Sequence, residues 1–168
     1  TTIGVDAFRS AIIHTSTLDL PESLTSIQGG AFREIGGGVQ TIILHKNLTS
    51  MGNGVFYGVT SINVVYCLAA TPPTIDNGAF QYVAENATLY VTSSALSAYQ
   101  GADGWKGFKE IKAIEGNVPC SKPDIHFFED NWLLNITCAT PHATIYYNTD
   151  GSNPTTSSTK YTTPFFYT

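Results

Sequence analysis

The sequence predicts a two-domain protein, in which a solenoid of stacked coils precedes a small all-β sandwich. The first observation is a repeat, because phenylalanine recurs every 24 residues, at positions 8, 32, 56 and 80. The second is a pair of alternating apolar residues that begins nine or ten residues after each phenylalanine and predicts one short strand per repeat. The third is the end of this rhythm after Ile114, where two prolines and a glycine indicate a domain boundary.

Further columns keep the phase of the phenylalanines. The same 24-residue offset relates an apolar column at Ile3, Ile27, Met51 and Ile75 and a small-residue column at Ala7, Ala31, Val55 and Ala79. Glycine stands two residues before each of the last three phenylalanines, at Gly30, Gly54 and Gly78. We expect a turn that needs a permissive backbone at these glycines. A repeat of this length cannot bury its apolar face alone, so the core must lie between neighbouring coils.

The predicted strands carry their inward residues in alternating pairs, namely Leu18 and Leu20, Ile42 and Leu44, Val65 and Cys67, and Leu89 and Val91. Alternation with period two over so few residues is typical of a short strand. The third pair comes one position early, and an insertion follows it at residues 70–74, where Pro72 and Pro73 predict a rigid turn. The phase of the repeat recovers at Ile75.

A repeat of 20 to 29 residues with one strand per turn is typical of leucine-rich solenoids. Residues 18–27, Leu-Asp-Leu-Pro-Glu-Ser-Leu-Thr-Ser-Ile, are followed by Gly-Ala-Phe at 30–32, and this stretch resembles the bacterial BspA-like leucine-rich repeat. The resemblance covers about residues 1–114. It implies a parallel-strand solenoid on a bacterial cell surface or in a secreted protein, with adhesion as its role.

Residues 93–114 are expected to cap the solenoid, and residues 89–91, 94–99 and 104–111 also resemble the closing segment of the BspA-like family. Ser93 or Ser94 is a candidate N-cap for a short helix that carries Leu96 and Tyr99 on one face and ends at Gly101. Apolar residues then cover the last coil, and they are Trp105, Phe108 and Ile111. For Trp105 the alternative to a buried cap residue is a ligand-stacking role. The first coil has no such closure, so we expect this chain to be a fragment of a longer protein.

Residues 115–122 form the predicted linker, and residues 123–168 alternate in the manner of short strands separated by turns. Residues 136–147, 149–155 and 161–165 resemble the chitobiase/β-hexosaminidase C-terminal module, which implies an immunoglobulin- or fibronectin-III-like sandwich over about residues 119–168. The closing strand of that module, beyond Phe166, is missing. An incomplete sandwich leaves a sheet edge open for pairing with another chain.

The residues between the inward pairs must project from the opposite face of the sheet. The central row is expected to read Asp19, Ile43, Tyr66 and Tyr90, with Thr17, Thr41, Val64 and Thr88 on one side and Pro21, His45, Leu68 and Thr92 on the other. Exposed apolar and aromatic strips often mark contact sites, and tyrosine combines an apolar ring with a hydrogen-bonding hydroxyl. The candidate binding residues are therefore Ile43, Tyr66, Tyr90, Asp19 and His45. Alternatively, this strip only packs the sheet, or the cap covers Tyr90.

The three cysteines have different expected states. Cys67 belongs to an inward pair, so a buried free thiol is expected. Cys120 and Cys138 lie where neighbouring strands of the second domain can bring them within bridging distance, and an exported protein would permit a disulfide between them. The alternative is two unpaired thiols.

Composition excludes several classes of function. With 8 Lys plus Arg against 13 Asp plus Glu, and a net charge of -5, the chain has no basic stripe for nucleic acid. No run of about 18 apolar residues exists to insert into a membrane. The four histidines do not have metal-ligand spacing, and no carboxylate pair is evidently held across a pocket. We therefore expect no enzyme activity and no cofactor.

The sequence thus predicts a non-catalytic bacterial surface or secreted protein. Its solenoid presents a binding face, and its second domain acts as a spacer. The expected partner is an extracellular or host protein, or a surface polysaccharide. One alternative is an accessory fragment of a carbohydrate-active enzyme whose catalytic domain lies elsewhere. Another is a structural array that holds other parts away from the cell surface.

Overall fold

The computed structural model of the chain describes residues 1–76, 78–115, 124–128, 133–137, 144–155, 157–163 and 165–166. The chain divides into two compact units, Thr1–Ile114 and Glu115–Thr168. Each unit is described by itself.

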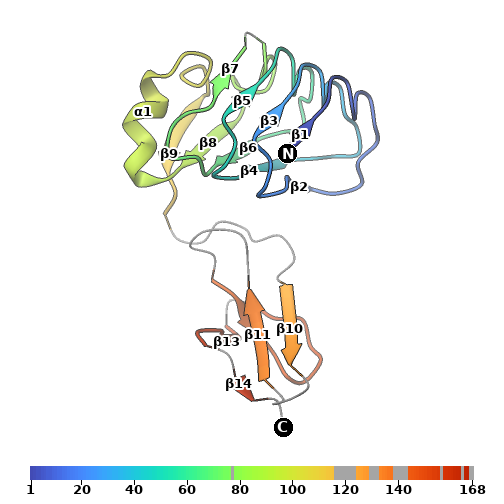
Figure 1. The fold of residues 1–168 in the computed structure, drawn as a ribbon, viewed down its shortest axis with the longest axis vertical. Coiled ribbons are helices and arrows are strands. Elements are labelled where there is room, and N and C mark those ends of the chain that lie inside the picture. Colours follow the sequence, from blue (N-terminus) through green and yellow to red (C-terminus); the bar gives the residue numbers. More distant parts are fainter. Residues whose placement is uncertain are drawn as a thin grey trace. The chain divides into compact units, whose positions relative to one another are not determined.

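The first unit is a parallel-strand β-solenoid of about five turns, as the repeat predicts. Its larger sheet has five strands in the order β2-β4-β6-β8-β9 (Figure 1), with bounds Thr17–Asp19, Thr41–Leu44, Val64–Cys67, Thr88–Val91 and Glu110–Ala113. A second sheet, in the order β1-β3-β5-β7, pairs the two-residue strands Thr2–Ile3, Ser26–Ile27, Ser50–Met51 and Thr74–Ile75. Sequence reasoning expected one strand per coil, and the apolar column that begins at Ile3 marks the second.

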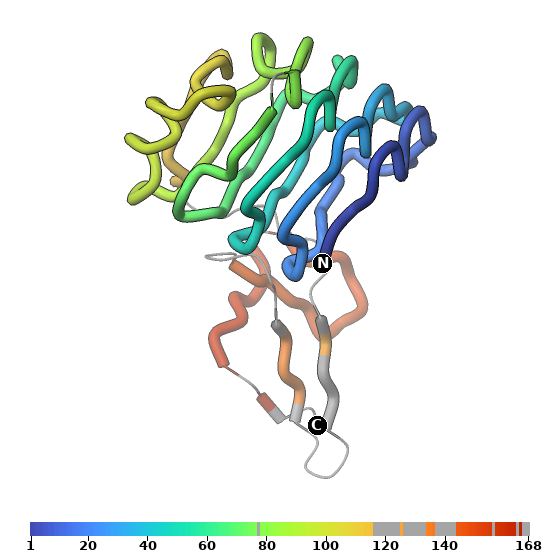
Figure 2. The backbone as a smooth tube through the Cα atoms, turned by 45° about the horizontal axis from the view of Figure 1, so that its top comes forward, coloured from blue at the N-terminus to red at the C-terminus, as the bar shows by residue number. Residues whose placement is uncertain are grey.

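The alternating pairs of the larger sheet point into the core as predicted. Seven of these eight residues are fully buried members of one apolar cluster, and Leu18, in the first coil, packs against it partly buried. Figure 2 shows the coils of residues 1–114 following one another along the stack. Because each coil is thin, its apolar residues are buried by the coil before and the coil after.

The four phenylalanines stack as one column. Their ring centroids lie 5.2, 5.3 and 5.5 Å apart from Phe8 to Phe80, with interplanar angles of 5°, 7° and 16°. Phe32, Phe56 and Phe80 are buried, but Phe8 is 45% exposed. Phe8 is the exposed end of the column, because it stacks on a phenylalanine ring on one side alone.

The backbone of the turns repeats together with the rings. The amides of the first three phenylalanines each donate to a carbonyl of the next coil, from Phe8 to Ala31 at 2.7 Å, from Phe32 to Val55 at 2.9 Å and from Phe56 to Ala79 at 2.8 Å. Gly30, Gly54 and Gly78 have φ of 68°, 63° and 82°, which confirms the need for a permissive residue in this turn. Asp6 takes the same position in the first coil with φ of 52°.

The cap begins with the 3₁₀ turn η1, Ser93–Ala95, and continues as helix α1, Leu96–Gly101. Tyr99 and Trp105 are fully buried, so Trp105 is a cap residue rather than an exposed stacking platform. The expected serine cap is wrong, because no side-chain capping hydrogen bond forms at either element. The hydroxyl of Ser94 lies instead 3.3 Å from that of Thr92.

Two side chains of the cap also form hydrogen bonds with the inserted turn of the third coil, at residues 70–74. The hydroxyl of Tyr99 donates to the carbonyl of Ala69 at 3.0 Å, and the indole of Trp105 donates to the carbonyl of Pro73 at 2.8 Å. These bonds satisfy polar groups at both ends of the inserted turn, and buried polar groups are costly when they have no partner. The extra residue is therefore accommodated by contacts that the cap supplies.

The described strands of the second unit are antiparallel. One sheet has the order β10-β11-β14, with bounds Asp124–Phe128, Leu133–Thr137 and Phe165–Phe166, and a second pairs β12 with β13, Tyr146–Tyr147 with Thr159–Lys160. Tyr161 ties two segments together, since its hydroxyl accepts from the amide of Ile136 and donates to Asn135. The immunoglobulin-like sandwich stays a prediction. Cys120 and Cys138 lie outside the described residues.

Replacing a buried ring of the phenylalanine column is expected to destabilise the solenoid strongly. Phe56→Ala leaves a cavity shared by neighbouring coils and should lower the free energy of unfolding by about 3–5 kcal/mol. Phe8→Ala is the matched control, and because its ring is 45% exposed the loss should be roughly half as large or smaller. Urea unfolding measures both variants, and equal losses would contradict the coil-to-coil account.

Burial of Cys67 is expected to make stability depend on alkaline pH. Burial raises the pKa of this thiol from 9.0 to about 11, while the unfolded chain keeps the ordinary value. Between these values the unfolded state loses its proton and the folded state does not, so stability should fall by about 2–3 kcal/mol as pH rises. Cys67→Ala should show a correspondingly smaller fall in unfolding free energy from pH 8.5 to 11. Parallel pH curves for the two proteins would refute the assignment.

Candidate binding face

The face of the larger sheet that points away from the core carries one row of facing residues. Strand register places Asp19 opposite Ile43, Ile43 opposite Tyr66, and Tyr66 opposite Tyr90. The fifth strand continues the row, because Tyr90 faces Lys112. We call these five residues the outer ladder. Their neighbours along each strand point toward the core. Because successive side chains of a strand point to opposite faces, the side chains of the outer ladder point away from the core.

Two tyrosines form the centre of the outer ladder. The rings of Tyr66 and Tyr90 stack with centroids 5.2 Å apart and an interplanar angle of 23°, and both residues are half-buried. Partial burial, and secondarily the neighbouring Tyr90, raise the pKa of Tyr66. Each ring covers one face of the other, and both residues keep part of their surface exposed. Such a surface offers hydrogen bonds beside apolar contact.

Lys112 ends the outer ladder with a charge. Its ammonium group lies 2.7 Å from the carboxylate of Glu110, and both side chains are about half exposed. Hydrogen bonding and charge attraction from Glu110 raise the pKa of Lys112, and the same pair lowers the pKa of Glu110. Sequence reasoning missed this strand because it lies beyond the phenylalanine repeat. The alternation of Glu110, Ile111, Lys112 and Ala113 is the signal that marks it.

Ile43 does not lie on an exposed strip, and this part of the expectation is wrong. The residue is 0% exposed, although it lies outside the main core cluster. Asp19 and Tyr66 flank it from the neighbouring strands, about 4.8 Å away on each side. On its own strand the next residue of this face is His45, whose ring reaches toward Asp19. Ile43 is therefore a buried member of the outer ladder and offers no surface to a ligand.

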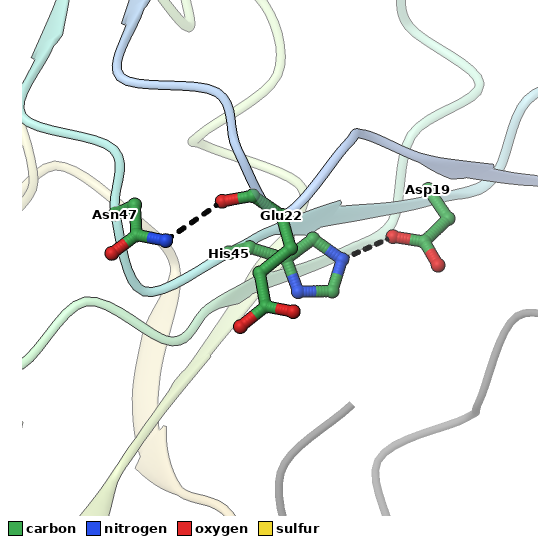
Figure 3. A network of polar contacts seen from close by, with 4 residues as sticks. All are labelled: Asp19, Glu22, His45 and Asn47. Carbon is green, nitrogen blue, oxygen red and sulfur yellow. Dashed lines mark hydrogen bonds and ion pairs between the residues drawn. The ribbon is translucent and has the colours of Figure 1, made fainter. Parts of the chain in front are cut away.

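His45 and Asp19 form a buried polar pair (Figure 3). The Nε2 atom of His45 lies 2.6 Å from a carboxylate oxygen of Asp19, and the side chains are only 3% and 14% exposed. The structure thus brings together two residues that the sequence placed in adjacent rows. With so little exposed surface, this pair holds β2 and β4 in register and presents little to a ligand.

The corner after β4 is fixed by two contacts to the first coil. The side-chain amide of Asn47 donates to the backbone carbonyl of Glu22 at 3.0 Å (Figure 3). Lys46 lies 2.6 Å from the carboxylate of Glu22, and this pairing lowers the pKa of Glu22. The side chains of Lys46 and Glu22 are 56% and 35% exposed, so water screens the ion pair and it is expected to add little stability. These contacts position the end of β4 relative to β2.

Among the described residues, no group of three His, Cys, Asp or Glu side chains is arranged to hold a metal ion. The same residues include no helix with the length and apolarity needed to cross a membrane.

Two family models match the sequence. The model described as "BspA type Leucine rich repeat region" matches residues 1–102 in six copies. The model described as "Chitobiase/beta-hexosaminidase C-terminal domain" matches residues 128–168. Neither matched region is a catalytic domain. No curated protein and no solved structure matches the chain.

Removing one partner of the buried pair is expected to destabilise the solenoid. Asp19→Ala leaves the His45 ring without its partner at a side-chain exposure of 3%, and should lower the free energy of unfolding by about 1–3 kcal/mol. Asp19→Asn keeps an acceptor oxygen and should recover part of the loss. Thermal unfolding compares these variants with Glu22→Ala, an exposed control with little expected effect. If Asp19→Ala matches that control, the pair is not structural.

Proposed function

The chain belongs to the BspA-type leucine-rich-repeat family, and from this membership and the outer ladder we propose that it is a non-catalytic recognition module that binds an extracellular protein. The proposed contact surface is the accessible part of the ladder, namely Tyr66, Tyr90 and Lys112. The largely buried residues beside it, Asp19, Ile43 and His45, are proposed to hold its strands in place. Adhesion is the proposed role of such binding.

The observation that carries this proposal is the stacked tyrosine pair on a rigid parallel sheet. The rings of Tyr66 and Tyr90 stack on one another with centroids 5.2 Å apart. The exposed parts of the two tyrosines, together with the Glu110–Lys112 pair, provide the mixed apolar and polar chemistry of a protein interface. Tyrosine in particular is enriched at protein interfaces and among their energetically dominant residues.

The proposed setting is a bacterial cell surface or a secreted protein. The BspA-type family is typically associated with bacterial surfaces, which supports this location. The second unit, which we propose to be a fibronectin-III-like sandwich, would then act as a spacer between the solenoid and other parts of the protein. Its short antiparallel strands are consistent with that role.

The second matched family favours one alternative function. A domain of the chitobiase/β-hexosaminidase C-terminal type suggests an accessory part of a carbohydrate-active enzyme. In that case the solenoid would place the enzyme near its substrate, and the catalytic carboxylates would belong to another domain. The two functions differ in the partner that the sheet face binds.

The proposal is tested by a binding screen against immobilised extracellular-matrix proteins. Tyr66→Ala combined with Tyr90→Ala should weaken a selective interaction at least about tenfold, because interface tyrosines often dominate binding. The control is Val5→Ala, which trims a 66% exposed side chain outside the larger sheet and should leave protein binding unchanged. Circular dichroism verifies that each variant is folded. No selective protein binding, or binding that survives the double substitution, would overturn the proposal.

A further inference from the structure

A second aromatic cluster lies on the turns of the solenoid, on residues outside the larger sheet. The guanidinium carbon of Arg33 lies 4.3 Å from the centroid of the Tyr57 ring. The ring of Tyr82 meets that of Tyr57 edge to face, with centroids 5.3 Å apart and an interplanar angle of 77°. Glu34 adds an exposed carboxylate beside Arg33. We call these four residues the turn cluster.

The backbone of Tyr82 is unusual for an aromatic residue. Its φ is 68°, in the left-handed region that bulky residues rarely adopt. The equivalent residues of the earlier coils, Ser10, Glu34 and Gly58, have φ of 56°, 56° and 75°, so the turn itself imposes this conformation. Glycine would adopt it at no steric cost, as Gly58 does. The chain instead holds there a tyrosine that is 47% exposed.

Packing explains only in part why a tyrosine, and not a glycine, stands at position 82. The ring of Tyr82 contacts that of Tyr57, and the neighbouring Tyr82 hydroxyl raises the pKa of Tyr57. Nearly half of Tyr82 nevertheless stays accessible, so the cluster does not bury it. Strained residues persist where the surrounding structure holds them in place, and they concentrate at functional sites.

The charges of the turn cluster favour a neutral ligand. The Nε atom of Arg33 lies 3.5 Å from the carboxylate of Glu34, so the two opposite charges offset one another. The same Nε atom makes no hydrogen bond, because the carboxylate is close enough for charge attraction but not in hydrogen-bonding geometry. Tyr82 is 47% exposed, and the side chains of Glu34 and Arg33 are 46% and 35% exposed, so a ligand can reach the tyrosine together with a charge pair that offsets itself.

We propose that the turn cluster is a binding site for a neutral sugar residue. The Tyr82 ring supplies a flat apolar surface for the carbon-bound hydrogens of the sugar, while its hydroxyl and the Glu34 carboxylate bind sugar hydroxyl groups. Arg33 and Tyr57 are positioning residues that support Tyr82 and orient Glu34. This site lies on different residues from the outer ladder and does not rest on the protein-binding proposal.

The test is an array of neutral hexose and N-acetylhexosamine oligosaccharides, with uronic-acid and sialylated counterparts for comparison. The affinity of any neutral oligosaccharide that binds is then measured by NMR titration. Tyr82→Gly suits this experiment because it removes the ring while glycine fits the left-handed backbone, so the variant should unfold at the same temperature as the parent chain or higher. Glu34→Gly, at φ of 56°, is the second variant for the same reason.

We expect the parent chain to bind neutral oligosaccharides and both glycine variants to bind at least about tenfold more weakly, which is the scale of losing one good contact. The Tyr66→Ala, Tyr90→Ala double variant should bind sugar as the parent does, which separates this site from the outer ladder. The proposal is overturned if no neutral oligosaccharide binds, if anionic ones bind better, or if Tyr82→Gly leaves the affinity unchanged.

Discussion

Contact between successive coils is the constraint on which the rest of the solenoid depends. A single coil has too few residues to enclose its own apolar side chains, so Phe32 and Phe56 are each covered by the phenylalanine rings of the coils before and after them. Hydrogen bonds from the amides of one turn to the carbonyls of the next join successive coils beside the stacked rings. The outer ladder is a consequence of this stacking, because the register that buries the inward pairs also aligns Tyr66 with Tyr90.

The closing segment shows how one irregularity is tolerated within a repeat. An inserted residue displaces the third coil at residues 70–74, and the carbonyl groups of Ala69 and Pro73 accept hydrogen bonds from two cap side chains. Tyr99 and Trp105 therefore each have two roles: their rings cover the apolar core of the last coil, and their polar atoms donate hydrogen bonds. Their polar atoms are satisfied at the insertion, so the last coil is closed without an unpaired buried donor.

Sequence reasoning found the columns that recur with the repeat and the insertion that interrupts it, but it missed the short second strand of each coil and the strand β9. The inward pairs, the glycine turn and the cap residues follow from spacing and residue type, and the structure confirms them. The two-residue strands were too short for alternation to reveal, and β9 lies outside the repeat. The outward row was aligned correctly, but the complete burial of Ile43 within that row is a property that a linear pattern cannot measure. The turn cluster likewise joins residues of three coils.

The account assigns different surroundings to the tyrosines of the solenoid, and chemical modification can separate them. Brief tyrosine nitration followed by mass spectrometry should label Tyr66 and Tyr90, which are half-buried, and leave Tyr99, which is fully buried, unlabelled. A bound extracellular protein should then protect Tyr66 and Tyr90 while Tyr82 is labelled as before. The central claim is contradicted if Tyr66 and Tyr90 are as unreactive as Tyr99 in the free chain, or if a bound protein leaves their labelling unchanged.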